Sequence, residues 1–282
     1  MHDIVRMAPL IFTRDLSVRI GSHDVCRALT WQVNPGERWA ILGKNGVGKS
    51  TLLKTLAGLR LAETGELIVC GAPIAVPPAR TVGSTLGVPT FSRESQRTLA
   101  KRRGYLTQHH SDPFPSTVME TALIGRHPHL GRWDWESTAD HEITRTALAE
   151  VDLVGFAERE VQTLSGGERQ RLAVAQLLTQ QPQLFLLDEP LTHLDLSHQV
   201  AIMELFKRKT QGEFSMTSAL VAVLHDPGFA VRYCEHALLL FGNGEWLAGP
   251  ARNIITAENL SRLYGHPLRE IGSDNDRWFI PC

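Results

Sequence analysis

The chain has 282 residues, which is enough for one large domain or two small ones. Its hydrophobic fraction of 43% and charged fraction of 21% are ordinary for a folded protein with a substantial core. The net charge is −1, from 29 Lys and Arg against 30 Asp and Glu, so the chain lacks a global basic field and we expect no nucleic-acid partner.

Cysteines and apolar runs narrow the class of protein further. The four cysteines form no CxxC pair, which favours reduced thiols over disulfides or a zinc site. They are Cys26, Cys70, Cys234 and Cys282. We expect no secretory signal, and the longest apolar runs are far shorter than the roughly 20 residues that span a bilayer. If the protein acts at a membrane, we expect another subunit to hold it there.

Strands and helices are expected to alternate along the chain. In chain order, the predicted elements are a strand at 39–42, helices at 49–59, 92–103, 136–150 and 168–178, and strands at 184–187 and 220–224. The strand stretches are short apolar runs followed by polar residues, a pattern typical of parallel strands buried on both faces. Prolines and glycines from Gly71 onward predict a loop before the second helix. In parallel sheets, ligands bind beyond the carboxyl ends of the strands.

The segment after the first predicted strand fits the pattern GxxxxGK[ST] and opens the first predicted helix. Its residues are Gly43, Lys44, Asn45, Gly46, Val47, Gly48, Lys49, Ser50 and Thr51. The glycines let backbone N–H groups turn inward around phosphates, and the helix N-terminus adds partial positive charge. Lys49 is expected to reach the β- and γ-phosphates, and the Ser50 hydroxyl to ligate Mg²⁺. The segment therefore predicts a nucleotide phosphate site.

Two acids, Asp188 and Glu189, directly follow the second predicted strand. Because successive strand residues face opposite sides of a sheet, the two carboxylates are expected to have different roles. One would hold Mg²⁺, directly or through water, and the other would address the attacking water as a general base.

A second anion site is indicated at Leu164–Gln170, where Ser165, Gly166 and Gly167 precede a helical run. This arrangement offers a hydroxyl, close backbone approach and the positive end of a helix dipole. A single nucleotide cannot readily occupy both phosphate loops of one chain. The economical solution is a head-to-tail homodimer, in which each ATP is held between 43–51 of one chain and 165–167 of its partner.

Taken together, these segments resemble the ABC ATPase family over nearly the whole chain, from about Leu10 to Tyr264. The matching segments are Gly43–Thr51 for the Walker A loop, Tyr105–Gln108 for the Q-loop, Leu164–Gln170 for the signature, Leu184–Glu189 for Walker B with the catalytic glutamate, Leu194–Asp195 for the D-loop and His225 for the switch histidine. The resemblance implies an α/β P-loop NTPase fold with a RecA-like parallel-sheet core, an N-terminal antiparallel β region and a helical signature subdomain. It also implies one domain over 1–282, with the helical subdomain at 105–178 and a short C-terminal extension at 250–282.

The resemblance assigns roles to individual residues. Glu189, His225 and Gln108 are expected to be catalytic, as the general base, the γ-phosphate contact and the contact to Mg²⁺ or the lytic water. The expected Mg²⁺ ligands are Ser50, Gln108 and Asp188. ATP is expected to contact the residues of the Walker A loop together with Ser165, Gly166, Gly167, Glu168 and Asp195, and Asp195 would communicate across the dimer.

Three further features are the position near Ile20, the histidines after Gln108 and the stretch 126–135. Members of the family commonly stack an aromatic residue on adenine at a position that here falls near Ile20, so we expect weaker base selectivity. His109, His110, His127 and His129 are metal-ligand types, but no matching acids or thiols complete a site, and surface or interface roles are favoured. The stretch 126–135 is rich in cations and aromatics, and in the family this region receives a cytoplasmic helix of the permease. We interpret it as an interface.

Several stretches are similar to the ATPases of bacterial importers for ferric siderophores, haem and vitamin B12. These are 121–129, 194–199, 224–234 and 263–265. The resemblance implies ATP-driven uptake through integral membrane permease subunits at the cytoplasmic face of the inner membrane, with a periplasmic or extracellular substrate-binding protein as an indirect partner. The alternative is a soluble ABC ATPase that serves a cytosolic assembly such as iron–sulfur cluster biogenesis.

Overall fold

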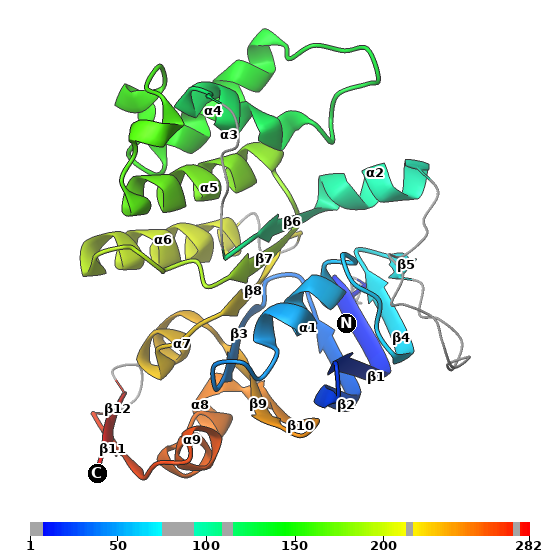
Figure 1. Ribbon diagram of the computed structural model, residues 1–282, viewed down its shortest axis with the longest axis vertical. Helices are drawn as coiled ribbons and strands as arrows, with labels where there is room; N and C mark the ends of the chain where they lie inside the picture. Colours follow the sequence, from blue (N-terminus) through cyan, green and yellow to red (C-terminus); the bar gives the residue numbers. More distant parts are fainter. Residues whose placement is uncertain (1–7, 75–92, 109–114, 213–216, 273–276) are drawn as a thin grey trace, which may run out of the picture.

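The structure is a computed structural model that describes residues 8–74, 93–108, 115–212, 217–272 and 277–282. Within these residues, a six-stranded sheet in the order β10-β9-β3-β8-β7-β6 runs through the middle of the molecule (Figure 1). Its strands are β3 (Arg38–Gly43), β6 (Arg103–Leu106), β7 (Leu184–Asp188), β8 (Ala219–Val223), β9 (His236–Gly242) and β10 (Glu245–Pro250). The strands from β9 to β6 are parallel, and β10 pairs antiparallel with β9. The predicted strands at 39–42, 184–187 and 220–224 are confirmed to within a residue as β3, β7 and β8.

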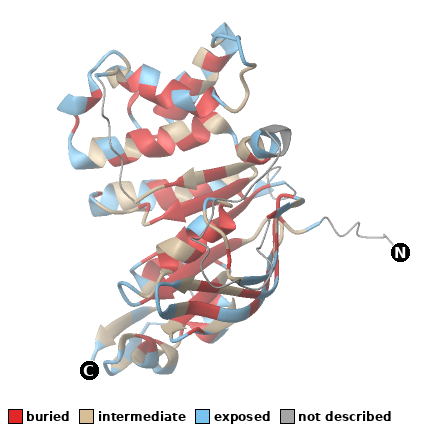
Figure 2. Ribbon diagram, turned by 45° about the vertical axis from the view of Figure 1, so that its right-hand side comes forward, coloured by how far each residue is buried: buried red, intermediate tan, exposed pale blue. Residues whose placement is uncertain are grey.

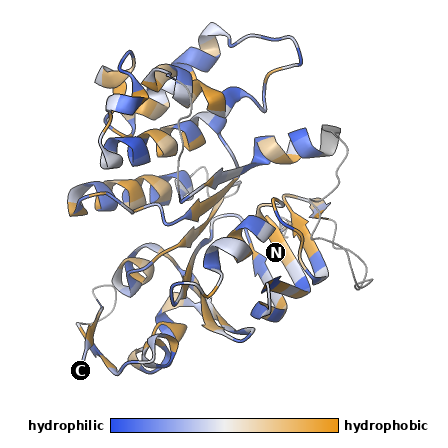
Figure 3. Cartoon of the chain, viewed as in Figure 1, coloured by the Kyte–Doolittle hydropathy of each residue, from blue (hydrophilic) through white to orange (hydrophobic). Residues whose placement is uncertain are grey.

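The central sheet is buried on both faces because its side chains alternate between two cores. Along β3, Ala40 and Leu42 belong to one buried cluster, whereas Trp39 and Ile41 belong to the other. Every residue of β3, β7 and β8 is buried. Figure 3 shows hydrophobic residues concentrated along these strands and on the helices beside them. Two-sided burial explains why these strands read as continuous apolar runs.

A second, antiparallel sheet in the order β2-β1-β4-β5 lies beside α1 (Lys49–Leu56). Its strands are β1 (Ile11–Ile20), β2 (His23–Val33), β4 (Thr64–Val69) and β5 (Ala72–Ile74). The predicted N-terminal antiparallel region is thereby confirmed. Leu52, Leu53 and Leu56 of α1 are fully buried in the cluster that joins the two sheets. The helix predicted to reach 59 ends earlier, and Gly58 just beyond it has a left-handed φ of 63°.

Helices form the upper part of the molecule in Figure 1. They are α3 (Val118–Leu123), η1 (Ile124–Arg126), α4 (Thr138–Ala149), η2 (Val154–Phe156), η3 (Val161–Thr163) and α5 (Gly166–Gln180). Three capping boxes begin α3, α4 and α5, at Thr117, Ser137 and Ser165. Figure 2 shows that the buried sides of these helices face one another. The helices predicted at 136–150 and 168–178 are confirmed, with ends displaced by one or two residues.

The remaining elements lie on either side of the central sheet. They are α2 (Arg93–Arg102), α6 (Leu196–Lys209), α7 (Pro227–Tyr233), α8 (Ala251–Ile254), α9 (Ala257–Tyr264), β11 (Leu268–Ile271) and β12 (Trp278–Pro281). The basic helix predicted at 92–103 is confirmed as α2, although Arg103 already belongs to β6. Part of the predicted loop after Gly71 is strand β5, and 75–92 lie outside the described residues. Within the described part of the chain, every helix is too short or too polar to cross a membrane.

Candidate nucleotide-binding site

The loop between β3 and α1 has the geometry of a phosphate cradle. Gly46 and Gly48 have left-handed φ angles of 79° and 103°. An added Cβ at Gly48 would collide with a methyl group of Val25, so this close approach requires glycine. Gly48 is the N-cap of α1 and forms no side-chain cap, which leaves the N-terminal N–H groups of the helix available to an anion.

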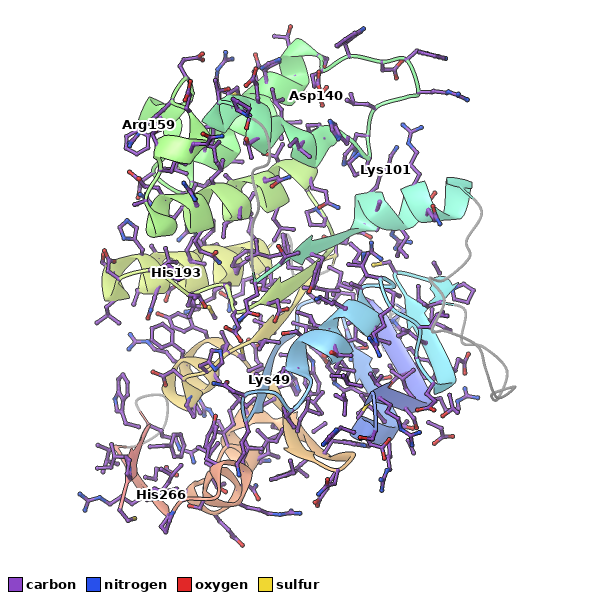
Figure 4. The ribbon with its side chains drawn as sticks, viewed as in Figure 1. Lys49, Lys101, Asp140, Arg159, His193 and His266 are labelled. Carbon is purple, nitrogen blue, oxygen red and sulfur yellow. The ribbon has the colours of Figure 1, made fainter. Side chains whose placement is uncertain are left out.

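The ammonium group of Lys49 lies inside this loop. Its Nζ donates to the carbonyl oxygens of Gly43 at 2.8 Å and Lys44 at 3.1 Å. Burial lowers the pKa of Lys49, and the nearby carboxylates of Glu189 and Asp188 oppose that shift. Figure 4 shows Lys49 near the centre of the molecule, at the start of α1. The residue predicted to contact the β- and γ-phosphates is therefore buried and pointed into the loop.

Asp188 lies at the end of β7, opposite the hydroxyl group of Ser50. Ser50 Oγ donates to Asp188 Oδ1 at 2.8 Å, and Tyr105 Oη donates to Oδ2 at 3.2 Å. Asp188 is 1% exposed, and burial raises its pKa while both hydrogen bonds oppose the shift. A buried carboxylate beside a hydroxyl is an all-oxygen donor set of the kind that Mg²⁺ prefers. Ser50 and Asp188 therefore fit the ion predicted for them.

Glu189 points away from Asp188 and toward the other two predicted catalytic residues. Its Oε1 lies 2.8 Å from His225 Nε2, and its Oε2 accepts a hydrogen bond from Gln108 Nε2 at 2.9 Å. Glu189 has a left-handed φ of 53°, so the chain turns sharply after the strand. The two acids do face different partners, but this strained backbone contributes to the divergence along with strand alternation.

The segment predicted as a second anion site begins α5. Ser165 is the N-cap and accepts from the Glu168 N–H at 3.3 Å, while the Glu168 carboxylate accepts from the Ser165 N–H at 2.6 Å. An added Cβ at Gly167 would lie 3.1 Å from the carbonyl oxygen of His193, so a side chain there would crowd the segment before α6. Ser165 and Gly166 are exposed, which leaves this helix N-terminus open to a ligand from outside the chain.

The structure does not bring all predicted ATP contacts together within one chain. The phosphate loop precedes α1, whereas Ser165 precedes α5; Figure 4 shows Lys49 and His193, which adjoins the second segment, on separate elements. Asp195 is the exposed N-cap of α6 and accepts from the His198 N–H at 2.9 Å. Hydrogen bonds from His198 and Ser197 lower the pKa of Asp195 to about 2.

Two residues near the site were missed as functional candidates. Tyr105 holds Asp188, yet an aromatic residue on an apolar strand reads as ordinary core; its only signal was its position in the stretch that leads to Gln108. Gln170 is 4% exposed, and its Nε2 donates to the carbonyl oxygen of Pro190 at 2.9 Å. This bond ties the signature helix α5 to the turn that carries Glu189.

The interpretation of 126–135 as an interface was wrong for Arg126. Its side chain is buried, and Nε donates to Asp140 Oδ1 at 2.7 Å while Nη1 donates to the carbonyl oxygen of Thr179 at 3.2 Å. Arg126 therefore joins η1 to α4 and α5 as a structural residue. Trp133 and Trp135 are 83% and 87% exposed, as an interface would require.

The candidate histidines have separate surroundings. His109 and His110 lie outside the described residues, and His129 Nε2 lies 2.9 Å from the carbonyl oxygen of Gln180.

A groove of about 430 Å³ opens beside β6, the strand that leads into the Q-loop. It lies between Thr107, Ile124, Pro128 and α5.

The predicted adenine position, Ile20, is the last residue of β1 and is 37% exposed. An added Cβ at Gly48 would lie 3.2 Å from Ile20 Cδ1, so the isoleucine covers the end of the phosphate loop. The side of the loop where adenine was expected is therefore lined by aliphatic groups.

The parallel sheet with a phosphate loop and a strand-end carboxylate defines a P-loop nucleoside triphosphatase. The open signature helix and the Gln108–Glu189–His225 cluster place it among ATPases of the ABC type. A profile of the family described as ABC transporter matches residues 26–192. The chain belongs to this family and is one of its ATP-hydrolysing components, in which hydrolysis is coupled to transport.

Individual relatives cover most of the chain. It is 35% identical over 253 residues to the ferric enterobactin transport ATP-binding protein FepC of Escherichia coli (strain K12), covering 89% of this chain and 85% of that protein. It is 34% identical over 266 residues to the hemin import ATP-binding protein HmuV of Bradyrhizobium diazoefficiens, with coverages of 92% and 89%. A solved structure described as an inward-facing metal-chelate type ABC transporter superposes with a TM-score of 0.78 at 26% identity, covering 98% of both chains.

Proposed function

We propose that two copies of this chain pair head to tail and hold each ATP between one phosphate loop and the partner's signature segment. The observation that carries this proposal is the separation of two open helix N-termini, at α1 and α5, within one chain. Each has unsatisfied N–H groups that favour phosphate oxygens. A closed two-fold arrangement uses both, because each chain supplies its α1 end to one nucleotide and its α5 end to the other.

Within each site, the residues have distinct tasks. Ser50 and Asp188 would hold Mg²⁺, which neutralises charge on the phosphates when bound. Lys49 is positioned to exchange its two carbonyl contacts for phosphate oxygens. Glu189 would accept a proton from the attacking water, and Gln108 and His225 hold its two carboxylate oxygens in place. Gln108, Glu189 and His225 converge before any substrate arrives, so the proposed proton acceptor is already positioned.

The subunit is proposed to act beneath integral membrane permease subunits, at the cytoplasmic face of the inner membrane. The groove beside the Q-loop offers a binding site for a permease helix, because it lies between Thr107, one residue before Gln108, and α5, which begins at the signature. A helix seated there would contact both the nucleotide-sensing strand end and the signature helix. Exposed Trp133 and Trp135 follow Pro128 in the chain and would add apolar surface for a partner.

The cargo is proposed to be a metal chelate, of the class that includes ferric siderophores, haem and vitamin B12, delivered by an extracytoplasmic substrate-binding protein. Two relatives that support this proposal are named as ferric enterobactin and hemin transport proteins. A structural neighbour is described as a metal-chelate type ABC transporter. The subunit itself would not touch the chelate. Its contribution is ATP-driven closure and reopening of the pair, which moves the permease between outward and inward states.

Co-purification tests this function. Tagged protein extracted with detergent should carry a polytopic membrane protein, and Ile124→Arg in the groove should abolish that association. Val154→Arg is a matched control, because Val154 is also an exposed apolar residue of the helical region, 55% against 44% for Ile124, but does not line the groove. Recovery of a soluble scaffold protein in place of a membrane protein would refute the transport function and support the cytosolic alternative.

A further inference from the structure

The C-terminal end of α9 contacts the phosphate loop. Gly265 closes the helix in a left-handed conformation, with φ 69° and its N–H donating to the carbonyl oxygen of Ser261. A Cβ built on Gly265 would lie 2.9 Å from Lys44 Nζ. The ammonium group therefore lies against the helix end that carries partial negative charge. The carbonyl of Lys44 meanwhile accepts from Lys49 Nζ at 3.1 Å, so the backbone of Lys44 is bonded inside the loop while its ammonium group lies beside the end of α9.

The same C-terminal region contacts the segment that carries the switch histidine. A Cβ on Gly228, in the first turn of α7, would lie 3.3 Å from Trp278 Cε3 of β12. The Gly228 N–H donates at 2.6 Å to Asp226, which directly follows His225. Tyr264 also lies near this carboxylate; burial and the charge of Asp226 raise the pKa of Tyr264 to about 12.

The helix that ends at Gly265 is packed into the core of the protein. Leu260 and Leu263 of α9 are buried in the same cluster as Phe229 of α7. Beyond the helix, Ser261 Oγ accepts from the Leu268 N–H at 2.8 Å. In Figure 1, α9, β11 and β12 lie side by side below α7. A region anchored in this way can transmit a fixed spacing between the two loops that it touches.

We propose that α9, Gly265 and β12 form a brace that sets the position of the phosphate loop relative to the switch histidine. Gly265 is its positioning residue and acts on the nucleotide through Lys44, whereas Trp278 acts on His225 through the start of α7. Phosphate-contacting groups must be held within a fraction of an ångström for full binding and turnover. The brace rests on nucleotide binding at this site and adds a C-terminal determinant to it.

The test measures binding of ADP, which is not hydrolysed, to the full chain in Mg²⁺ by calorimetry. Gly265→Ala should weaken ADP binding about fivefold or more, because the new methyl group displaces Lys44. Gly212→Ala is the matched control: Gly212 has φ 63°, so the backbone strain is similar, but an added Cβ meets nothing within 4 Å. This control should bind ADP within about twofold of wild type. Its melting temperature should fall by about as much as that of Gly265→Ala, because both substitutions add backbone strain.

A double-mutant cycle separates the Lys44 contact from backbone strain. In a Lys44→Ala background, Gly265→Ala should change ADP affinity by less than about twofold, because the displaced group is gone. The brace is overturned if Gly265→Ala binds ADP as the wild type does, or if its loss is equally large in both backgrounds. Failure of wild type and Gly212→Ala alike to bind ADP would refute the nucleotide site itself.

Discussion

Glu189→Gln removes one negative charge from the catalytic cluster while preserving the size of the side chain. The carboxylate has donors on both sides, Gln108 Nε2 at 2.9 Å and His225 Nε2 at 2.8 Å, and its side chain is only 14% exposed. An amide retains one oxygen for Gln108 and can place its NH₂ against an unprotonated His225 nitrogen. The geometry should therefore survive, whereas the capacity to accept a proton from water is lost.

General-base catalysis contributes about 10²- to 10⁴-fold to a rate, so the barrier should rise by about 3–5 kcal/mol. Steady-state phosphate release at saturating MgATP should fall by at least about a hundredfold, while ATP binding measured by equilibrium dialysis changes little. Glu142→Gln, an exposed residue of α4, is the control for the chemistry of the substitution and should hydrolyse ATP normally. Turnover of Glu189→Gln within tenfold of wild type would refute the general-base role.

Two further predictions concern the pH dependence of stability and the metal site. Hydrogen bonds from Ser137, and then Arg126, lower the pKa of Asp140 to about 2 from 3.8; the depressed carboxylate stabilises the fold above pH 3.8, and this contribution is lost as the pH falls toward 2. Between pH 3.8 and 2, the free energy of unfolding in urea should therefore fall by on the order of 2 kcal/mol less for Asp140→Asn than for the wild type. An equal fall in the two proteins would contradict the role assigned to Asp140. Tyr105→Phe deletes one of the two hydrogen-bond donors to Asp188 and should raise the Mg²⁺ concentration for half-maximal ATPase activity roughly tenfold. An unchanged Mg²⁺ requirement would show that Tyr105 does not support the metal site.

The residues that could be identified from sequence lie in short contiguous segments whose chemistry is local. These segments are the phosphate loop, the acids after β7 and the capped start of α5. In each of them, polar residues or glycines lie at the end of a strand or the start of a helix, where they can bind a phosphate or a metal ion. Parallel strands then bring their carboxyl ends to one edge, so Ser50 meets Asp188 and Gln108 meets Glu189 without any further information.

What escaped prediction depends on partners that are distant in sequence or ambiguous in type. Arg126 reads as a surface cation until the folded chain places Asp140 and the end of α5 around it. The turn at Glu189 has a left-handed φ, which a glutamate residue does not favour and which therefore could not be predicted from the residue type. The contact of Gly265 with Lys44 joins a helix end to a loop from the other half of the chain, and no local pattern encodes it.

We propose that one chain cannot complete its ATP sites alone. Sedimentation velocity of Glu189→Gln with MgATP tests this dependence on a second chain, because slow hydrolysis allows the closed pair to accumulate. We expect a shift from monomer to twice the monomer mass, with one ATP bound per chain. Adding Ser165→Arg should leave ATP bound to a monomer, while Ser137→Arg, which removes the equivalent cap from α4, should still permit pairing. The requirement for a pair would be contradicted if ATP-bound Glu189→Gln stays monomeric. It would also be contradicted if Glu189→Gln with Ser165→Arg still forms the pair.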